Sequence, residues 1–477
     1  MDKETENKVE HKKNVKLPRF GMRHQQVICL FLLVVSAISM RVQLSVVIVA
    51  MLDPNASSNP DIRTFDWNNK NVVLSSFFWG YITLQLFAAD WARTYGAKPF
   101  LLVAMTINAT AVALVPILAD KFQSYGVMAS RVIQGMCQGF VFPSVSTLLG
   151  RWCHISERSR LGSWCLSGAA FGTIISLFTN GLIASSQLGW PFCFYIYGAI
   201  GYLWVLLFLF LGSSSPAQCS RISKEEKEYI ESSTKIKVNK IQVPWKSILT
   251  TRPVWILMFA QVGQIWGYNT LITEIPNYMK AVMLFDMKSN GALSSAPYIA
   301  SFFCNFGFGF LADYLINHKY LTRTATRKLF NSISGIGAGT SLLILSFLPA
   351  SARIPSVFML VSAVGIQSAA TGGYNLNHID LSPNFSGTLQ AMCNSVGSAL
   401  SSFAPILVQL IVTDDGNKSQ WQIVFIVAAM AYIIPSIAFA MFASGKRQKW
   451  DGSKEVDEKT LSEVIARKAS VWSVMSV

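Results

Sequence analysis

The chain is poor in charged residues. Of its 477 residues only 14% are Asp, Glu, Lys or Arg, whereas 52% are hydrophobic. A soluble globular domain carries about 25% charged residues, so this composition excludes an ordinary water-soluble protein. Long apolar runs fill most of the sequence instead, and they predict an all-α protein that crosses a lipid bilayer many times.

The chain also lacks the short motifs that carry enzymatic chemistry. It contains no P-loop, GxSxG or HExxH sequence, and none of its five His residues stands at catalytic spacing from a Cys or Asp. Its eight Cys residues include no CxxC pair. Those inside apolar segments (Cys29, Cys137, Cys165, Cys304 and Cys393) are expected to be small buried hydrophobes. We therefore predict that the protein is not an enzyme and has no resident cofactor.

Positive charge is unevenly distributed along the chain. The net charge is +15, but Lys and Arg gather in the two tails and in loops at 151–160 and 319–328, while the alternate loops carry few. Membrane proteins keep such basic segments on the cytosolic side. The distribution argues against a nucleic-acid-binding groove and predicts that both termini are cytosolic.

Twelve segments are long and apolar enough to cross a membrane, for which about 20 residues are needed. They lie at 26–52, 72–92, 97–119, 125–150, 161–184, 191–212, 253–283, 291–316, 328–349, 354–378, 384–412 and 420–444. A polar stretch at 213–252 divides them six and six. We expect a cytosolic tail (1–25), a first six-helix half (26–212), a cytosolic linker with one short surface helix (213–252), a second half (253–444) and a cytosolic tail (445–477).

A weak repeat relates the two halves. Asp90 closes the second segment and Asp313 the eighth, each directly before a basic loop. With the arginines of the basic loops, these carboxylates can form a charge clamp that gates the cytosolic mouth. Ordinary interfacial charge is the alternative explanation of the same pattern. Together with the six-plus-six count, the repeat favours two related bundles around a central cavity.

Three ionisable residues lie well inside apolar segments: Arg41, Arg131 and Glu274. A charge at the centre of a membrane helix costs about 2.5–3.5 kcal/mol on insertion scales, and such residues usually face a transport path or pair with one another. The first half offers the two arginines no acidic partner, which favours an anionic substrate, because the guanidinium fork suits carboxylate or phosphate. Glu274 lies nearer an outer end, as a coupling or gating group or as a solvated one.

Further polar residues accompany the arginines. Gln134 and Gln138 follow Arg131 at i+3 and i+7 on one helix face, whereas Gly135 and Gly139 predict close helix packing. The remaining candidates for substrate contact are Tyr81, Gln138, Gln264, Tyr268 and Asn269, for each of which helix packing is the alternative role.

Four glycosylation sequons are present. Those at Asn55 and Asn417 fall in predicted outer loops, where an acceptor is reachable. Asn108 falls inside the segment 97–119, and Asn384 begins the segment 384–412 from the cytosolic side, so we expect glycans only at Asn55 and Asn417.

Several stretches resemble a known family. "RVQLSVVIVAM", "SSFFWGYITLQ", "RVIQGMCQGFVFPS", "WGYNTLITEIPNYM" and "GYNLNHIDLSPNFSGTLQAMCNSVGS" are similar to the anion cotransporters of solute carrier family 17, which include sodium/phosphate cotransporters, sialin and vesicular glutamate transporters. The insect branch labelled as inorganic phosphate cotransporters is the most similar. The resemblance implies the major facilitator superfamily fold, alternating access of two six-helix halves, and substrate contacts from Arg41, Arg131 and Tyr81.

The chain departs from that family at some positions. Gln138 stands where a glutamate serves in proton coupling, Leu74 where the glutamate transporters have a histidine, and Gln264 where they have an arginine. These departures argue against glutamate as the substrate and against proton coupling through Gln138, and they favour sodium coupling or none.

The sequence thus predicts a secondary active transporter of inorganic phosphate or of a small organic anion, with sodium as the candidate coupling ion. A non-transporting anion sensor or scaffold that keeps the transporter fold is the alternative. We expect a multi-pass monomer whose partners are the anion and the bilayer. The plasma membrane is expected rather than a lysosomal or vesicular membrane, because neither tail carries an acidic dileucine motif.

Overall fold

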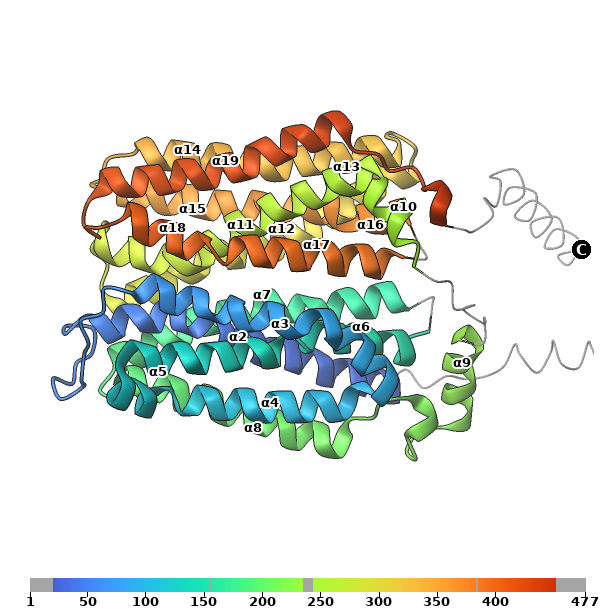
Figure 1. Ribbon diagram of the computed structural model, residues 1–477, viewed down its shortest axis with the longest axis horizontal. Helices are drawn as coiled ribbons and strands as arrows, with labels where there is room; N and C mark the ends of the chain where they lie inside the picture. Colours follow the sequence, from blue (N-terminus) through green and yellow to red (C-terminus); the bar gives the residue numbers. More distant parts are fainter. Residues whose placement is uncertain (1–19, 155–156, 235–242, 383–384, 452–477) are drawn as a thin grey trace, which may run out of the picture.

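Two bundles of long, nearly parallel helices lie against each other in the computed structural model (Figure 1). The structure describes residues 20–154, 157–234, 243–382 and 385–451. We call the end of the bundles that carries α9 and α10 the linker end, and the opposite end the loop end (Figure 1).

The first bundle follows the predicted segments. Its helices are α2 (Met22–Leu52), α3 (Lys70–Tyr95), α4 (Ala97–Ala113), α5 (Val115–Gln138), α6 (Val141–Trp152), α7 (Arg158–Ser185) and α8 (Gly189–Leu211). Within α5 the chain leaves helical geometry at Gln123, with φ 55° and ψ −144°. The first turns of α5 therefore continue the crossing begun by α4, and the rest of α5 with α6 forms the next one, as the segments 97–119 and 125–150 predict.

The second bundle contains α11 (Arg252–Ala281), α12 (Met287–Asn317), α13 (Arg323–Ser332), α14 (Ala338–Phe347), α15 (Arg353–Gln367), α16 (Tyr374–Leu381), α17 (Ser386–Ser401), α18 (Ala404–Ile411) and α19 (Lys418–Phe442). A π-helical turn at Ile333–Gly337 joins α13 to α14, so these helices make one crossing. The pairs α15–α16 and α17–α18 likewise each correspond to one predicted segment.

Nine helical stretches of the described residues are long and apolar enough to cross a membrane, and α4 is a shorter apolar helix. α3 and α11 do not belong to the nine. In α11 the reason is that its buried face carries polar side chains, among them Gln261, Gln264, Asn269 and Glu274. Polar residues buried in such a helix indicate contact with the other half or with a cavity rather than with lipid.

Small residues bring α3 and α5 into backbone contact. A Cβ atom on Gly135 would lie 2.0 Å from the carbonyl oxygen of Phe77, and one on Gly80 would lie 1.9 Å from that of Val132. A Cβ atom on Gly139 would also face α3, at 3.0 Å from the Tyr81 carbonyl oxygen. The close packing predicted for Gly135 and Gly139 is confirmed, and it fixes α3 against α5 beside the centre of the molecule.

The linker is more structured than the sequence suggests. It contains a 3₁₀ turn (Pro216–Gln218), α9 (Lys224–Thr234) and α10 (Trp245–Thr250), where one surface helix was expected. α9 is docked: the Glu226 carboxylate is buried and accepts hydrogen bonds from the backbone N–H groups of Met22 and Arg23 and from Arg23 Nη1. The charges of α9 thus bind the start of α2, because that helix end offers unpaired N–H donors.

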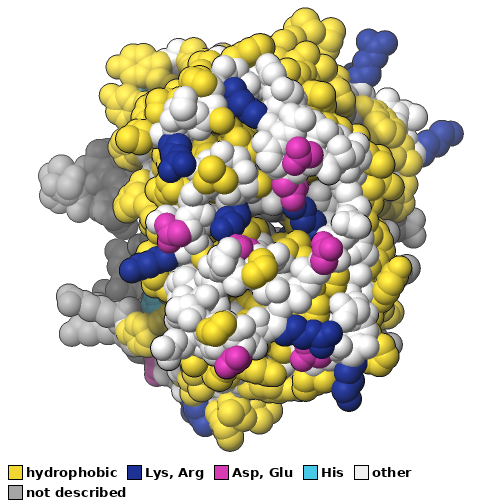
Figure 2. Space-filling view, turned by 90° about the vertical axis from the view of Figure 1, so that its left-hand side faces the viewer, with side chains coloured by type: hydrophobic (Ala, Val, Ile, Leu, Met, Phe, Trp, Pro, Cys, Tyr) yellow, Lys and Arg dark blue, Asp and Glu magenta, His cyan; other side chains and the backbone are white. Residues whose placement is uncertain are grey.

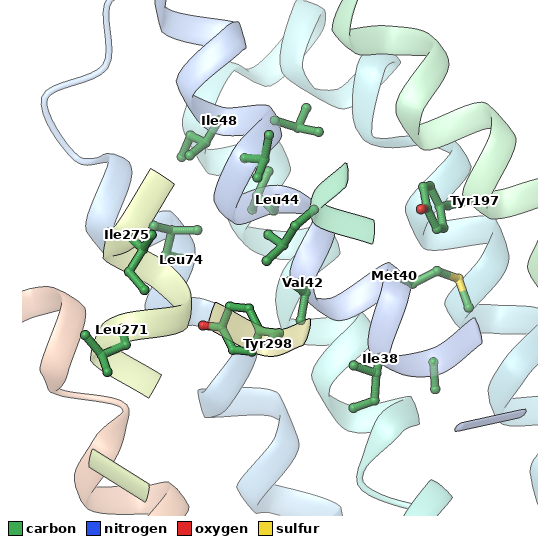
Figure 3. Close-up of a cluster of buried hydrophobic side chains, with 14 of the residues drawn as sticks. Ile38, Met40, Val42, Leu44, Ile48, Leu74, Tyr197, Leu271, Ile275 and Tyr298 are labelled. Atoms are coloured by element: carbon green, nitrogen blue, oxygen red, sulfur yellow. The ribbon is translucent and has the colours of Figure 1, made fainter. Parts of the chain in front are cut away.

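The two halves meet along α2, α7, α11 and α12, and also where α3 contacts α17 and α18. Near the loop end α7 and α12 touch through glycines, since a Cβ on Gly181 would lie 2.6 Å from the Gly291 Cα. One hydrophobic cluster spans the halves, with Ile38 and Leu74 from the first and Leu271 and Ile275 from the second (Figure 3).

Candidate functional site

A cavity of about 210 Å³ lies between the two halves. Its walls come from α2, α3, α5, α6, α7 and α11. The lining residues are Ile38, Arg41, Val42, Ser45, Leu74, Phe77, Phe78, Arg131, Phe142, Ala169, Thr173, Tyr268, Asn269, Ile272 and Thr273. Most of this surface is apolar or aromatic, and the two charged groups on it are the arginines predicted from the sequence.

Arg41 presents its guanidinium to the cavity. It lies over three aromatic rings of α3, with its Cζ 4.9 Å from the ring centre of Phe77, 5.1 Å from that of Phe78 and 5.2 Å from that of Tyr81. Within the described part of the chain the guanidinium forms no hydrogen bond and no ion pair. Its charge is therefore met only by ring faces.

Arg131 is more deeply buried, with 5% of its surface exposed. Its Nη1 donates to Gln134 Oε1 at 3.0 Å and its Nη2 to the backbone oxygen of Arg41 at 3.1 Å. Its Nε has no hydrogen-bond partner, and its Cζ lies 4.8 Å from the Phe77 ring centre. The Phe77 ring thus holds both guanidinium groups beside the same cavity.

These contacts do not compensate two buried charges. A cation–π contact is worth about 0.5–2 kcal/mol, whereas removing an ion from water costs several kcal/mol even after relaxation. Among the described residues, no carboxylate forms an ion pair with Arg41 or with Arg131. Two guanidinium groups on one cavity wall suit the binding of an anion.

The sequence identified part of this site. Tyr268 and Asn269, the predicted substrate contacts on α11, line the cavity, and Asn269 is held by a 2.8 Å hydrogen bond from its Nδ2 to Ser401 Oγ. Tyr81 does not line the cavity in this structure, but its ring lies against the guanidinium of Arg41. Tyr81 therefore contacts the guanidinium of Arg41 and does not form part of the cavity wall.

Two of the predicted contact residues point elsewhere. Gln138 is buried and donates from Nε2 to the Ala37 carbonyl oxygen at 2.9 Å, so it ties α5 to α2. Gln264 accepts from Gln367 Nε2 at 3.1 Å and from Ser334 at 3.3 Å within the second half. Both amides thus form hydrogen bonds to protein groups, although Gln264 Nε2 has no partner among the described residues, and neither side chain lines the cavity here.

The charge pattern of the sequence does not predict the aromatic wall of the cavity. Leu74, Phe77 and Phe78 line the cavity, and Tyr81 continues the same face of α3. Their spacing of three, one and three residues is that of one helix face. The stretch "LSSFFWGY" therefore contained the signal, since an aromatic face beside intramembrane arginines favours cation–π contact.

The predicted gating carboxylates are dispersed. Glu274 lies in α11, next to the cavity residue Thr273, with 2% of its surface exposed. Asp313 is exposed and forms no ion pair with the described residues, whereas the buried pair near the linker end joins Arg327 to Asp380 at 2.6 Å. The side chain of Asp90 lies outside the described residues. The predicted charge clamp of Asp90 and Asp313 with arginines at the cytosolic mouth stays a prediction.

The sequons differ in accessibility. Asn55 and Asn417 are exposed at the loop end, and Asn417 caps α19 by accepting from the Ser419 N–H at 3.0 Å. Asn108 is fully buried and donates to the sulfur of Met40. Asn384 lies outside the described residues. The predicted use of Asn55 and Asn417 stays a prediction that this exposure supports.

Comparisons with known proteins identify the fold family. The sequence profile described as Major Facilitator Superfamily matches residues 29–405. The chain belongs to this superfamily. Its helices superpose on the crystal structure of a D-xylose-proton symporter with a TM-score of 0.66 at 14% identity, covering 88% of this chain and 99% of that one, which supports the fold alone.

Relatives of similar length narrow the family. The chain is 35% identical over 468 residues to a Drosophila melanogaster protein named "Putative inorganic phosphate cotransporter", covering 92% of this chain and 88% of the relative. It is 31% identical over 435 residues to human sialin, covering 86% and 87%. The predicted resemblance to solute carrier family 17 is confirmed. The protein is a multi-pass secondary transporter related to anion transporters, and it is not an enzyme.

Proposed function

We propose that the protein is a secondary active transporter of a small organic anion, which binds with its negative group between Arg41 and Arg131. The observation that carries this proposal is the pair of guanidinium groups on one cavity wall, held by Phe77 and left without a carboxylate partner. A planar guanidinium suits a carboxylate through two parallel hydrogen bonds. The bound anion supplies the missing counter-charge.

The cavity wall favours an organic anion over inorganic phosphate. Phosphate presents oxygen on every side, and a polar group moved from water to an apolar wall without a hydrogen bond costs about 2–7 kcal/mol. Here Phe77, Phe78, Phe142 and Ile272 cover much of the wall. An anion with one charged end and an apolar body would place its charge at the arginines and its body against these side chains.

Phosphate remains the second candidate, because a relative of 35% identity carries the name of an inorganic phosphate cotransporter. Its other oxygens would have to accept hydrogen bonds from polar side chains of the wall, which are those of Thr173, Tyr268, Asn269 and Thr273. Whether monocarboxylates inhibit phosphate exchange distinguishes an organic anion from phosphate as the substrate of this site.

Transport would follow from rocking of the two halves about the cavity, as in other proteins of this architecture. We place the linker end in the cytosol, because the basic loops gather there and the exposed sequons lie at the opposite end. In this structure the loop end is closed by contact between the halves at Gly181 and Gly291. We further propose that the protein acts as a monomer in the plasma membrane.

The test is exchange by the purified protein in lipid vesicles. Vesicles loaded with unlabelled anion would take up the same labelled anion in counterflow, with phosphate, aliphatic and aromatic monocarboxylates and dicarboxylates offered in turn. Charge-assisted hydrogen bonds contribute about 1.5–3 kcal/mol each, so Arg41→Ala and Arg131→Ala should each weaken exchange by about tenfold or more. Arg63→Ala is the matched control, since Arg63 is exposed at the loop end and pairs with exposed Asp120.

Exchange at the wild-type rate in both arginine variants would show that the anion binds elsewhere. Anion-induced thermal stabilisation without any exchange would favour the sensor or scaffold instead. Phosphate exchange that monocarboxylates do not inhibit would replace the organic anion with phosphate in this proposal.

A further inference from the structure

The loop end of the molecule carries a group of opposite charges at its centre, surrounded by hydrophobic side chains toward the rim (Figure 2). Two ion pairs there cross between the halves. Lys70, the first residue of α3, pairs with Asp415, which precedes α19. Lys280, in the last turn of α11, pairs with Asp53 after α2, with 2.5 Å between Nζ and Oδ2. Each half supplies one lysine and one aspartate, and we call these two pairs the outer latch.

The outer latch stands between the anion site and the solution at the loop end. A second cavity of about 160 Å³ lies directly beneath it, lined by all four latch residues. This second cavity shares Ser45, Leu74 and Thr273 with the anion cavity. An anion entering from the loop end would have to pass the latch, so the latch must open for entry and close behind the substrate.

Glu274 is the one acidic group of α11, and it lies on the inner side of the latch. Glu274, Asn277 and Lys280 are spaced three residues apart, which places them on one face of α11. The Glu274 carboxylate is buried, and no donor meets either oxygen in good hydrogen-bond geometry, although the Thr273 and Asn277 side chains lie close enough to favour its ionised form. Its side chain is therefore buried near the contact between the halves with only weak compensation for an ionised form.

The charged neighbours of Glu274 are already engaged. Lys70 and Asp415 are the charges that act on its carboxylate, but the Lys70 ammonium pairs with Asp415 and donates to Asn277 Oδ1 at 3.2 Å. α17 and α18, which also pack on α11, contain no charged residue. Asp53 and Lys280 pair with each other, and Arg41 lies deeper, in the anion cavity.

We propose that Glu274 takes up a proton from the loop-end solution when the outer latch closes, so that the anion and one proton are transported together. An ionised carboxylate buried without partners costs several kcal/mol, and a proton bound to one carboxylate oxygen removes that charge. When the halves open at the linker end, the proton leaves to water there. A monoanion and a proton together move no net charge. This inference rests on the proposed anion transport.

A sodium ion fits this position less well than a proton. Hard cations require several oxygen ligands. Asn277 Oδ1 already accepts from Lys70, the Thr273 hydroxyl donates to the Asn269 carbonyl oxygen at 2.9 Å, and the Lys70 ammonium would repel a second cation. Proton coupling thus moves from the position of Gln138, which cannot titrate, to Glu274 in the other half.

The first test separates coupling from binding. Wild-type vesicles under an inward proton gradient should accumulate the anion above its equilibrium level, and an imposed sodium gradient should not replace the proton gradient. Glu274→Gln, which resembles the protonated form, should lose this accumulation while keeping counterflow exchange. Asp286→Asn is the matched control: Asp286 caps α12 at the loop end, hydrogen bonds from Ser289 lower the pKa of its carboxyl, and this variant should keep the proton effect.

Four results would overturn the inference. These are accumulation driven by protons in Glu274→Gln, equal loss in Asp286→Asn, no proton effect in a wild-type protein that does exchange, and sodium-driven accumulation that Glu274→Gln abolishes. Absence of exchange in the wild type would overturn the proposed function itself, and the inference with it.

The second test follows the latch directly and keeps Glu274 in place. In Ile48→Cys, the new thiol would line the second cavity and would be labelled from the loop end by a membrane-impermeant thiol reagent. The background is the labelling of the parent chain. Lys70→Ala should increase the labelling rate severalfold, and exchanging the charges (Lys70→Asp with Asp415→Lys) should return it toward the parent rate.

Acidifying the loop-end solution should slow this labelling by more than the loss of reactive thiolate slows it at any cysteine, because proton binding favours the closed latch. With Glu274→Gln added, only the slowing that comes from the thiol chemistry should remain. A rate that falls equally with and without Glu274 would show that proton uptake is not linked to closure of the latch.

Discussion

Replacing Gly135 with alanine tests whether the close contact between α3 and α5 positions the anion site. A Cβ atom at residue 135 would lie 2.0 Å from the Phe77 carbonyl oxygen and 2.7 Å from the Tyr81 nitrogen. Both are backbone atoms, so no side-chain rotation relieves the overlap. Restoring an ordinary contact of 3.4 Å from 2.0 Å requires the two helices to separate by about 1.4 Å at this point.

The separation has two measurable consequences. Overpacking of this kind costs about 1–3 kcal/mol of stability. It also moves the Phe77 ring, whose centre lies 4.9 Å from the Cζ of Arg41 and 4.8 Å from the Cζ of Arg131. A displacement of about 1 Å in a group that positions reacting partners can cost about a hundredfold in rate. We therefore expect anion exchange by Gly135→Ala to fall by about tenfold to a hundredfold.

The assay is counterflow exchange in vesicles, normalised to the amount of folded protein, together with the thermal unfolding midpoint in detergent. Gly307→Ala is the matched control, because Gly307 is also helical and a Cβ there would meet no atom within 4 Å. Wild-type exchange and an unchanged midpoint in Gly135→Ala would refute the reasoning. A lower midpoint with undiminished exchange would show that the contact stabilises the bundle without positioning the arginines.

Three further predictions concern other parts of the molecule. Glu226→Gln should lower the thermal midpoint by less than the about 3–5 kcal/mol that breaking an isolated buried pair costs, because Arg23 keeps its ion pair with Glu157 at 3.0 Å. An unchanged midpoint would mean that α9 does not hold the start of α2. Asp380→Asn should destabilise the protein by about 3–5 kcal/mol, because the buried Arg327 would lose the carboxylate that pairs with it at 2.6 Å, and Asp380→Glu should restore part of the loss. Asn417→Gln should remove one glycan, seen as faster migration on a denaturing gel of protein expressed in eukaryotic cells, and equal migration before and after the substitution would show that the sequon is not used.

The membrane crossings could be read from the sequence because they depend on local composition. Every predicted segment coincides with one helix or with consecutive helices, including the crossing that ends near the turn at Gln123. The docking of α9 could not be predicted, because it depends on a contact between Glu226 and Arg23, which lie 203 residues apart. The sequence of a polar helix does not show which of its charged residues forms an ion pair with another helix.

The sequence predicts only part of the site, for the same reason. Arg41 and Arg131 stood out because a charge in an apolar segment is costly wherever the helix lies. Gln138 looked equivalent to them on its helix face, but its amide donates to the Ala37 carbonyl oxygen and does not reach the cavity. Whether a polar side chain faces a substrate or a neighbouring backbone depends on which helix packs beside it.

By itself, the sequence determined that this protein crosses a membrane in two six-helix halves and that it buries two arginines with no acidic partner in their own half. These properties follow from hydrophobic length and from the cost of an intramembrane charge, which are local quantities. The tertiary structure decided that Phe77 lies against both guanidinium groups, and that Lys70 meets Asp415, 345 residues away. Such meetings depend on how the halves pack together, because only packing brings distant residues within the few ångströms over which ion pairs and cation–π contacts act.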